Sequence, residues 1–361
     1  MNEMRTASTK TETGQIFPMP KSCATLRTGI LLLFHLFFLS GNSAGQEGLP
    51  AMRTDDRVRI AEAMNISSIY GEQIWKGLSR VPFTMILVTD SVEFLTGHPS
   101  PTDDFTCLGH DSLLASDIYF RKRVFGKQLL ATFPAVKGVN TIVVGTPENT
   151  GKNSTDWIIT LLHEHFHQYT YGSPGYFAAV DSLSLSGGDQ TGMWMLNFPF
   201  PYADSTIGFR YRAFADALLG CLGALDSLSF YDRFSVYRSE REHLTSALSP
   251  ADYRYFSFQV WQEGLARYAE FRFLGALSGY TPSHGLAALS DFVPFDKYRS
   301  EFYRRQYDQL AHSRLDQQKR VCFYAIGFAE GQILDKVNPS WRDHFLRRRF
   351  YIEKYFRQDD R

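Results

Sequence analysis

The apolar positions of this chain follow two different spacings, and each spacing occupies its own part of the sequence. Between residues 83 and 145, short apolar runs are separated by polar breaks, Gly and Pro, a pattern typical of β-strands. From residue 155 onward, apolar residues recur every three or four positions, which predicts helices. A helical pattern at residues 55–80 precedes the first strand. The pattern therefore predicts an α+β protein, with a small mixed β-sheet followed by a mostly helical region.

The individual elements can be placed along the chain. Strands are expected at residues 83–89, 117–124, 129–136 and 140–145. Helices are expected at residues 155–171, 209–228, 231–248, 258–271, 297–318, 320–337 and 341–356. Gly and Pro predict a loop at residues 173–204, and its bulky apolar residues suit either a pocket wall or a loop folded onto the core. After a leader at 1–45, residues 46–150 and 151–361 are expected to form one continuous unit.

Residues 1–45 have the layout of a secretory signal peptide. Basic residues come first, an apolar run follows at residues 29–39, and Ser43, Ala44 and Gly45 offer small side chains for cleavage. The apolar run is short for a membrane span, so no stable membrane insertion is expected after cleavage. The sequence predicts a secreted or periplasmic protein. An N-terminal membrane anchor that is not cleaved is the alternative.

The expected helix at residues 155–171 carries the sequence H-E-x-x-H, formed by His163, Glu164 and His167. Residues four apart lie on the same face of a helix, so the two imidazoles can bind one Zn²⁺. Glu164 beside them can act as general base on a water activated by the metal. His165 points away from this face and is expected to pack in the core. The alternative is that all of these histidines are surface or core residues without a metal.

A catalytic zinc site takes three protein ligands and keeps one position open. The candidate for the third ligand lies in the stretch W-Q-E-G-L-A-R-Y-A-E at residues 261–270. Glu263 and Glu270 are two helical turns apart and share a face. One carboxylate could bind the metal while the other orients a ligand histidine. The alternative is two solvated glutamates on an amphipathic helix.

H-E-x-x-H followed by W-x-E-G-x-A-x-Y-x-E resembles the gluzincin zinc peptidases, the group of thermolysin and the aminopeptidase-N type enzymes. The resemblance implies that His163, His167 and Glu263 bind zinc and that Glu164 is the base. It also implies a tyrosine hydroxyl that stabilises the oxyanion, and Tyr324 matches that residue in relative placement. Glu270 is then the residue that orients a ligand histidine.

The resemblance covers two helices, and the sequence departs from the family around them. His167 and Glu263 are separated by 96 residues, far more than in those enzymes. The G-x-M-E-N signature that holds a substrate's free amine is absent, and Arg267 stands where thermolysin has an aspartate. The resemblance therefore implies catalytic machinery but not exopeptidase specificity.

Gluzincins also line the site with an antiparallel edge strand, to which an extended peptide can add as a further strand. The resemblance gives this role to the region of residues 132–145. The alternative is that residues 141–144 form a buried central strand.

Charge and cysteine content narrow the remaining classes of function. The formal net charge is +0, so nothing in the charge favours a nucleic-acid partner. Cys107, Cys221 and Cys322 are widely spaced and allow at most one disulfide. The sequence therefore predicts an exported zinc-dependent hydrolase, a peptidase with a peptide or protein substrate. The alternatives are a zinc-dependent amidase or esterase acting on a non-peptide substrate, and a non-catalytic binding protein on a degenerate peptidase fold.

Overall fold

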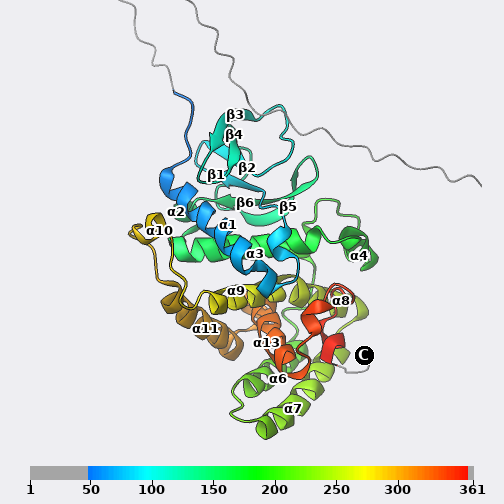
Figure 1. The fold of residues 1–361 in the computed structure, drawn as a ribbon. Helices are drawn as coiled ribbons and strands as arrows, with labels where there is room; N and C mark the ends of the chain where they lie inside the picture. Colours follow the sequence, from blue (N-terminus) through cyan, green and yellow to red (C-terminus); the bar gives the residue numbers. More distant parts are fainter. Residues whose placement is uncertain (1–47, 357–361) are drawn as a thin grey trace, which may run out of the picture. The chain divides into compact units, whose positions relative to one another are not determined.

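In a computed structural model of the protein, which describes residues 48–356, the strand-like runs form one six-stranded sheet (Figure 1). The strands lie in the order β3-β4-β2-β1-β6-β5. They are β1 (Met85–Val88), β2 (Val92–Thr96), β3 (Thr106–Asp111), β4 (Ser116–Lys122), β5 (Leu130–Val136) and β6 (Val139–Gly145).

The sheet is mixed because one of its pairings is parallel. β1 pairs in parallel with β6, and the other neighbouring strands are antiparallel. β1 is buried along its whole length because both faces of the sheet are covered there, Met85 and Leu87 belonging to one apolar cluster and Ile86 and Val88 to another. β6 is likewise internal, which agrees with the expectation of a buried central strand at residues 141–144, whereas β5 lies at the edge.

The helices follow the sheet in sequence, apart from α1, which precedes it. Those with more than two turns are α1 (Thr54–Ile74), α3 (Ser154–Tyr171), α6 (Ser205–Leu222), α7 (Ser227–Ser246), α8 (Pro250–Gln259), α9 (Leu265–Ala276), α11 (Phe295–His312) and α13 (Cys322–Val337). The shorter ones are α2 (Pro147–Thr150), α4 (Tyr176–Ser182), α5 (Trp194–Asn197), α10 (His284–Ala287) and α12 (Leu315–Gln318). The α+β class predicted from the sequence is confirmed.

Two local predictions were wrong, and two strands were missed. β2 and β3 were not predicted, because their polar residues hide the strand pattern. The segment at 173–204 is not all loop, since it contains α4 and α5. The expected helix at 341–356 is replaced by two 3₁₀ turns, η4 (Trp341–Asp343) and η5 (Ile352–Phe356), and between them Phe350 has a φ of 69° that no α-helix can contain.

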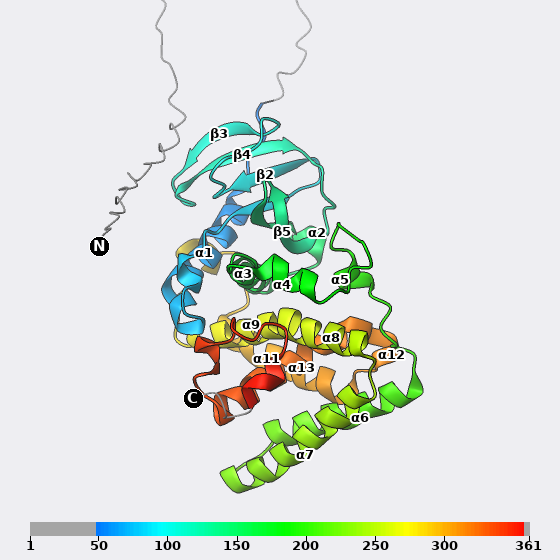
Figure 2. The ribbon, with the colours of Figure 1, turned by 90° about the vertical axis from the view of Figure 1, so that its right-hand side faces the viewer.

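α3 lies between the sheet and α9, as Figures 1 and 2 both show. α8 and α9 run end to end on the far side of α3 from the sheet (Figure 2), joined by a π-helical turn, η2 (Val260–Gly264). The core on this side is rich in aromatic residues, and Trp75, Phe166 and Trp261 are completely enclosed within it. This packing fixes α3 from both sides.

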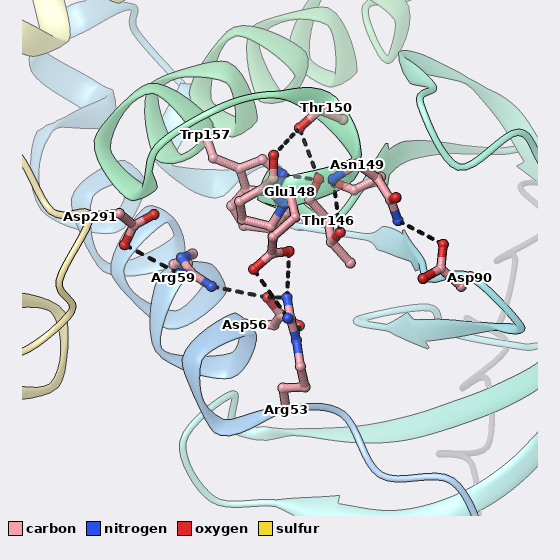
Figure 3. Close-up of polar contacts among 12 residues, drawn as sticks. Arg53, Asp56, Arg59, Asp90, Thr146, Glu148, Asn149, Thr150, Trp157 and Asp291 are labelled. Atoms are coloured by element: carbon pink, nitrogen blue, oxygen red, sulfur yellow. Dashed lines mark hydrogen bonds and ion pairs between the residues drawn. The ribbon is translucent and has the colours of Figure 1, made fainter.

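The N-terminal end of α3 is tied to α1 by buried charges. Arg59 of α1 lies between Asp56 and Asp291 (Figure 3), and its Nε donates to the Ser154 hydroxyl at 2.7 Å. Asp291 in turn accepts from the Ser154 backbone N–H at 2.9 Å. Burying an arginine is costly, and its charge-assisted contacts with Asp56, Asp291 and Ser154 offset that cost and fix its direction, so the start of α3 is held in place.

The chain from Leu49 onward forms one compact unit. No helix among residues 48–356 is both long and apolar enough to cross a membrane. The predicted signal peptide at 1–45 lies outside the described residues. Cys221 and Cys322 are buried as free thiols.

Candidate metal centre

α3 presents both motif histidines on one buried face. Asn153 caps the helix, its side chain accepting from the backbone N–H of Asp156, so the helix begins where the polar run predicts. The possible ligand atoms of His163, Glu164 and His167 all lie within 4.8 Å of one another, and all three residues are buried. The Nε2 atoms of the two histidines are 3.1 Å apart. This group is a candidate buried metal site.

Glu263 reaches the same point from the other side. Its Oε2 lies 3.5 Å from His163 Nε2 and 3.6 Å from His167 Nε2. Glu263 lies in the π-helical turn η2, a distortion that adds a residue to the turn and occurs often at functional sites. Two nitrogens and one carboxylate oxygen therefore converge from helices that are far apart in the sequence.

The backbone of α13 passes very close to this turn because glycines face each other at the crossing. A Cβ built on Gly264 would lie 2.5 Å from the Gly327 Cα, and one built on Gly327 would lie 2.5 Å from the Gly264 Cα. No side chain fits there. The close approach brings Tyr324, one turn before Gly327, beside His163, with ring centroids 6.3 Å apart and planes only 10° from parallel.

Each histidine of the pair is hydrogen-bonded through its other ring nitrogen. His163 Nδ1 lies 2.6 Å from Glu270 Oε1, and Arg267 holds the second Glu270 oxygen at 2.9 Å. His167 Nδ1 lies 3.2 Å from the side-chain amide of Gln262. Such contacts fix the rotation of the imidazoles and leave both Nε2 atoms facing Glu263.

The Gln262 amide is itself fixed by tyrosines. It contacts the Tyr171 hydroxyl at 2.5 Å and accepts from the Tyr176 hydroxyl at 2.8 Å. The Tyr171 ring lies over His167, with centroids 5.6 Å apart. Tyr324 and Tyr171 thus cover one histidine each.

Glu164 faces the sheet. Its Oε2 accepts from the Thr132 hydroxyl at 2.8 Å, and the same hydroxyl is 2.9 Å from the Glu164 backbone oxygen. Thr132 belongs to the edge strand β5. The carboxylate next to the histidine pair is therefore held by the strand at the border of the sheet.

The buried charges shift each other's pKa values. Burial alone would lower the pKa of His163, but Glu263, Glu270 and Glu164 outweigh it and raise the pKa to about 9. Burial opposes ionisation of Glu263, but His163 and His167 hold its pKa well below the usual range. Burial and the neighbouring Glu263 keep the pKa of Tyr324 far above that of a free phenol. At neutral pH Tyr324 therefore keeps its proton and remains a hydrogen-bond donor.

The structure brings together all the candidate site residues taken from the sequence: His163, Glu164, His167, Glu263, Glu270 and Tyr324. His165 points elsewhere, stacking on Phe83 with ring centroids 4.7 Å apart.

Sequence reasoning missed several neighbours of the site: Thr132, Tyr171, Gln262 and Arg320. Tyr171 follows His167 by four residues, so its place on the ligand face could have been recognised. The other three depend on contacts between distant elements.

The chain was compared with protein-family models, with curated proteins and with solved structures, and none of the three comparisons found a match. The gluzincin resemblance accordingly rests on the residues of the two helices and on the buried His163, Glu164 and His167 cluster.

Proposed function

We propose that the protein is a zinc-dependent hydrolase that cleaves peptide bonds, with His163, His167 and Glu263 as metal ligands. The observation that carries the proposal is the triangle of His163 Nε2, His167 Nε2 and Glu263 Oε2, whose sides are 3.1, 3.5 and 3.6 Å. A tetrahedral zinc with ligands at about 2.0–2.1 Å keeps them about 3.3 Å apart. The atoms present fit the ion without rearrangement of the helices.

Besides Glu270, which contacts His163 Nδ1, two carboxylates lie near the histidine pair, and their contacts separate their roles. Glu263 Oε2 faces both Nε2 atoms. Glu164 is held by Thr132 and leans toward the sheet. We assign Glu263 as the ligand and Glu164 as the base. A zinc ion held there would polarise the scissile carbonyl and lower the pKa of an attacking water.

The surrounding residues have roles that follow from their contacts. Glu164 takes a proton from the attacking water and passes it to the leaving amine. Tyr324 keeps its proton and can donate it in a hydrogen bond to the developing oxyanion. Glu270 accepts the Nδ1 proton of His163, which keeps the Nε2 lone pair of that histidine on the metal. The Gln262 amide, 3.2 Å from His167 Nδ1, fixes the rotation of the second imidazole.

Peptides are favoured over other substrates by the position of β5. One side of β5 pairs with β6, and no strand among residues 48–356 pairs with the other. An extended peptide can form backbone hydrogen bonds with such an edge. Thr132 of this strand contacts Glu164, so a peptide on β5 would pass the base. With the signal sequence expected at 1–45, we propose that the enzyme acts after export.

Metal content and turnover test the proposal together. Mass spectrometry of protein purified without chelator should find one zinc per chain, lost or much weakened in Glu263→Ala. Glu164→Gln should keep the zinc and lose peptide cleavage. Glu301→Ala, an exposed glutamate on α11, is the matched control and should change neither. Wild-type protein that binds no zinc after reconstitution, or full turnover in Glu164→Gln, would refute the assignment.

A further inference from the structure

Arg320 lies beside the candidate metal centre and is held there by one tyrosine. It belongs to the 3₁₀ turn η3 (Lys319–Val321) that leads into α13. Its guanidinium donates to the Tyr324 hydroxyl at 3.0 Å, and its central carbon is 5.9 Å from the centre of the Tyr324 ring. Arg320 is thus positioned by a hydrogen bond to the Tyr324 hydroxyl, which lies beside Glu263.

The backbone before Arg320 is strained. Lys319 has a φ of 49° and a ψ of −133°, a combination that residues with a Cβ rarely adopt. Such conformations cluster at binding sites, where the rest of the structure maintains them because they aim a side chain. Here the strained residue comes directly before the arginine that turns toward the site.

Arg320 forms no direct ion pair with a carboxylate in the part of the chain that the structure describes, and the charge of nearby Glu263 acts on it without a contact. The other arginine over the Tyr324 ring, Arg267, is paired with Glu270 at 2.9 Å. The buried Arg241 is paired with Glu330 at 2.8 Å. Arg320 is half-buried, and the one hydrogen bond that its guanidinium makes within residues 48–356 goes to a neutral hydroxyl. A guanidinium has several N–H donors in a planar fork, so donors remain for another acceptor.

The charges at the site do not cancel once zinc is bound. The two positive charges of the ion are matched by Glu263 and Glu164, and Arg267 is matched by Glu270. The positive charge of Arg320 is left over. A site with one unmatched cation in a partly buried position attracts an anionic ligand.

We infer that Arg320 binds a carboxylate of the substrate, and that the site prefers peptides with a negative charge next to the scissile bond. The inference rests on the proposed function and names its substrate class. The carboxylate would come from a free peptide C-terminus or from an Asp or Glu side chain. Either carboxylate can accept a pair of N–H···O hydrogen bonds from a guanidinium. The opposite charges of the two groups strengthen these hydrogen bonds. The hydrogen bond from Arg320 to Tyr324 places this charge close to the carbonyl that Tyr324 would contact.

Binding of two small ligands to the zinc-loaded protein tests the inference without turnover. Benzylsuccinate carries a carboxylate for the metal and a second one for Arg320, and 4-phenylbutanoate lacks the second. Calorimetry should give a dissociation constant at least about tenfold lower for benzylsuccinate, as expected for a charge-assisted contact. Arg320→Gln should abolish this difference, and Arg320→Lys should keep part of it. Neither change should alter zinc content or the affinity for 4-phenylbutanoate.

Arg305→Gln is the matched control. Arg305 also donates to a tyrosine hydroxyl, that of Tyr298 at 3.0 Å, and lies 5.1 Å from the centre of that ring. It should keep the wild-type preference for benzylsuccinate. Zinc-loaded wild type with equal affinity for the two ligands would overturn the inference while leaving the proposed function standing. Protein that binds no zinc would overturn both.

Matched peptides then identify the source of the carboxylate. Cleavage of peptides with a free C-terminus is compared with that of their amides, and cleavage next to Asp with cleavage next to Asn. A preference for the free acids supports the C-terminal carboxylate, and a preference for Asp supports a side chain. Either preference should disappear in Arg320→Gln. Equal kcat/KM within both pairs in the wild type would contradict the inference.

Discussion

Zinc affinity should rise steeply with pH, because His163 must lose a proton to bind the metal. Its neighbours Glu263, Glu270 and Glu164 raise its pKa to about 9, so below that pH the zinc-free site carries a proton that zinc must displace. The apparent dissociation constant should therefore fall about tenfold for each pH unit up to about 9, or about a hundredfold between pH 6.5 and 8.5.

The same pKa sets the stability of the zinc-free protein. The pKa of His163 is raised above that of the unfolded chain, so the charged imidazole stabilises the folded state. This contribution is complete below about pH 6.5 and is lost as the pH rises through about 9, a change of about 3 kcal/mol. With zinc bound the proton is absent, and this part of the pH dependence disappears.

Glu270→Gln tests how strongly the proton on His163 competes with zinc. The substitution removes a carboxylate 2.6 Å from His163 Nδ1, which lowers the pKa of His163 and loosens the imidazole. Zinc affinity at pH 8.5 should fall about tenfold to a hundredfold, as for other partners of ligand histidines. At pH 6.5 the gap to the wild type should be smaller, because the variant has less proton competition.

Competition with a chromophoric chelator across pH 6–9 measures these affinities. Calorimetry in buffers of different ionisation enthalpy counts the released proton, and about one per zinc is expected at pH 7.5. Glu301→Gln should titrate as the wild type does. A zinc affinity independent of pH between 6.5 and 8.5 would refute the protonation argument.

Other parts of the structure give three further predictions. Gly327→Ala should cost about 1–3 kcal/mol in thermal unfolding and weaken zinc binding, because its Cβ would lie 2.5 Å from backbone atoms, whereas Gly275→Ala on α9, with open space, should be neutral or stabilising. Thr132→Val should keep the zinc but lower kcat/KM about tenfold or more by freeing the Glu164 carboxylate, and Thr132→Ser should restore activity. Burial lowers the pKa of His165 to about 4, so stability should fall by up to about 3 kcal/mol between pH 6.5 and 4, and urea unfolding of zinc-free His165→Leu should show a shallower dependence in that window.

The parts of this site that follow from local geometry could be predicted from the sequence. Asn153 and the apolar residues of α3 define a helix, and a helix alone puts His163 and His167 on one face. Glu263 was found by motif although it lies 96 residues further along the chain. Glu263 lies close to the histidines because of how the helices pack against each other. Neither motif alone indicates this packing, but the two motifs together do.

The missed features depend on tertiary partners. β2 contains Glu93, which looks like a break in a strand but is completely buried because Arg121 of β4 pairs with it at 2.8 Å. Near the C-terminus, residues 341–356 have the composition of a helix, yet the chain turns at Phe350. Nothing in the sequence marked Gln262 as a site residue, because its role depends on its contact with His167 in the folded chain.

The π-helical turn η2 has a consequence for chain length. Such a turn contains one residue more than an α-helix, and each helical residue turns the chain by about 100°. A deletion of one residue there would convert α8, η2 and α9 into a single regular helix and rotate its two halves relative to each other. Tyr255 and Gln259, which donate to the Met195 carbonyl at 2.9 and 2.7 Å, could then no longer face their partner while Glu263 faces the histidines. Natural variants of this protein are therefore expected to exchange residues within Val260–Gly264 but to preserve their number.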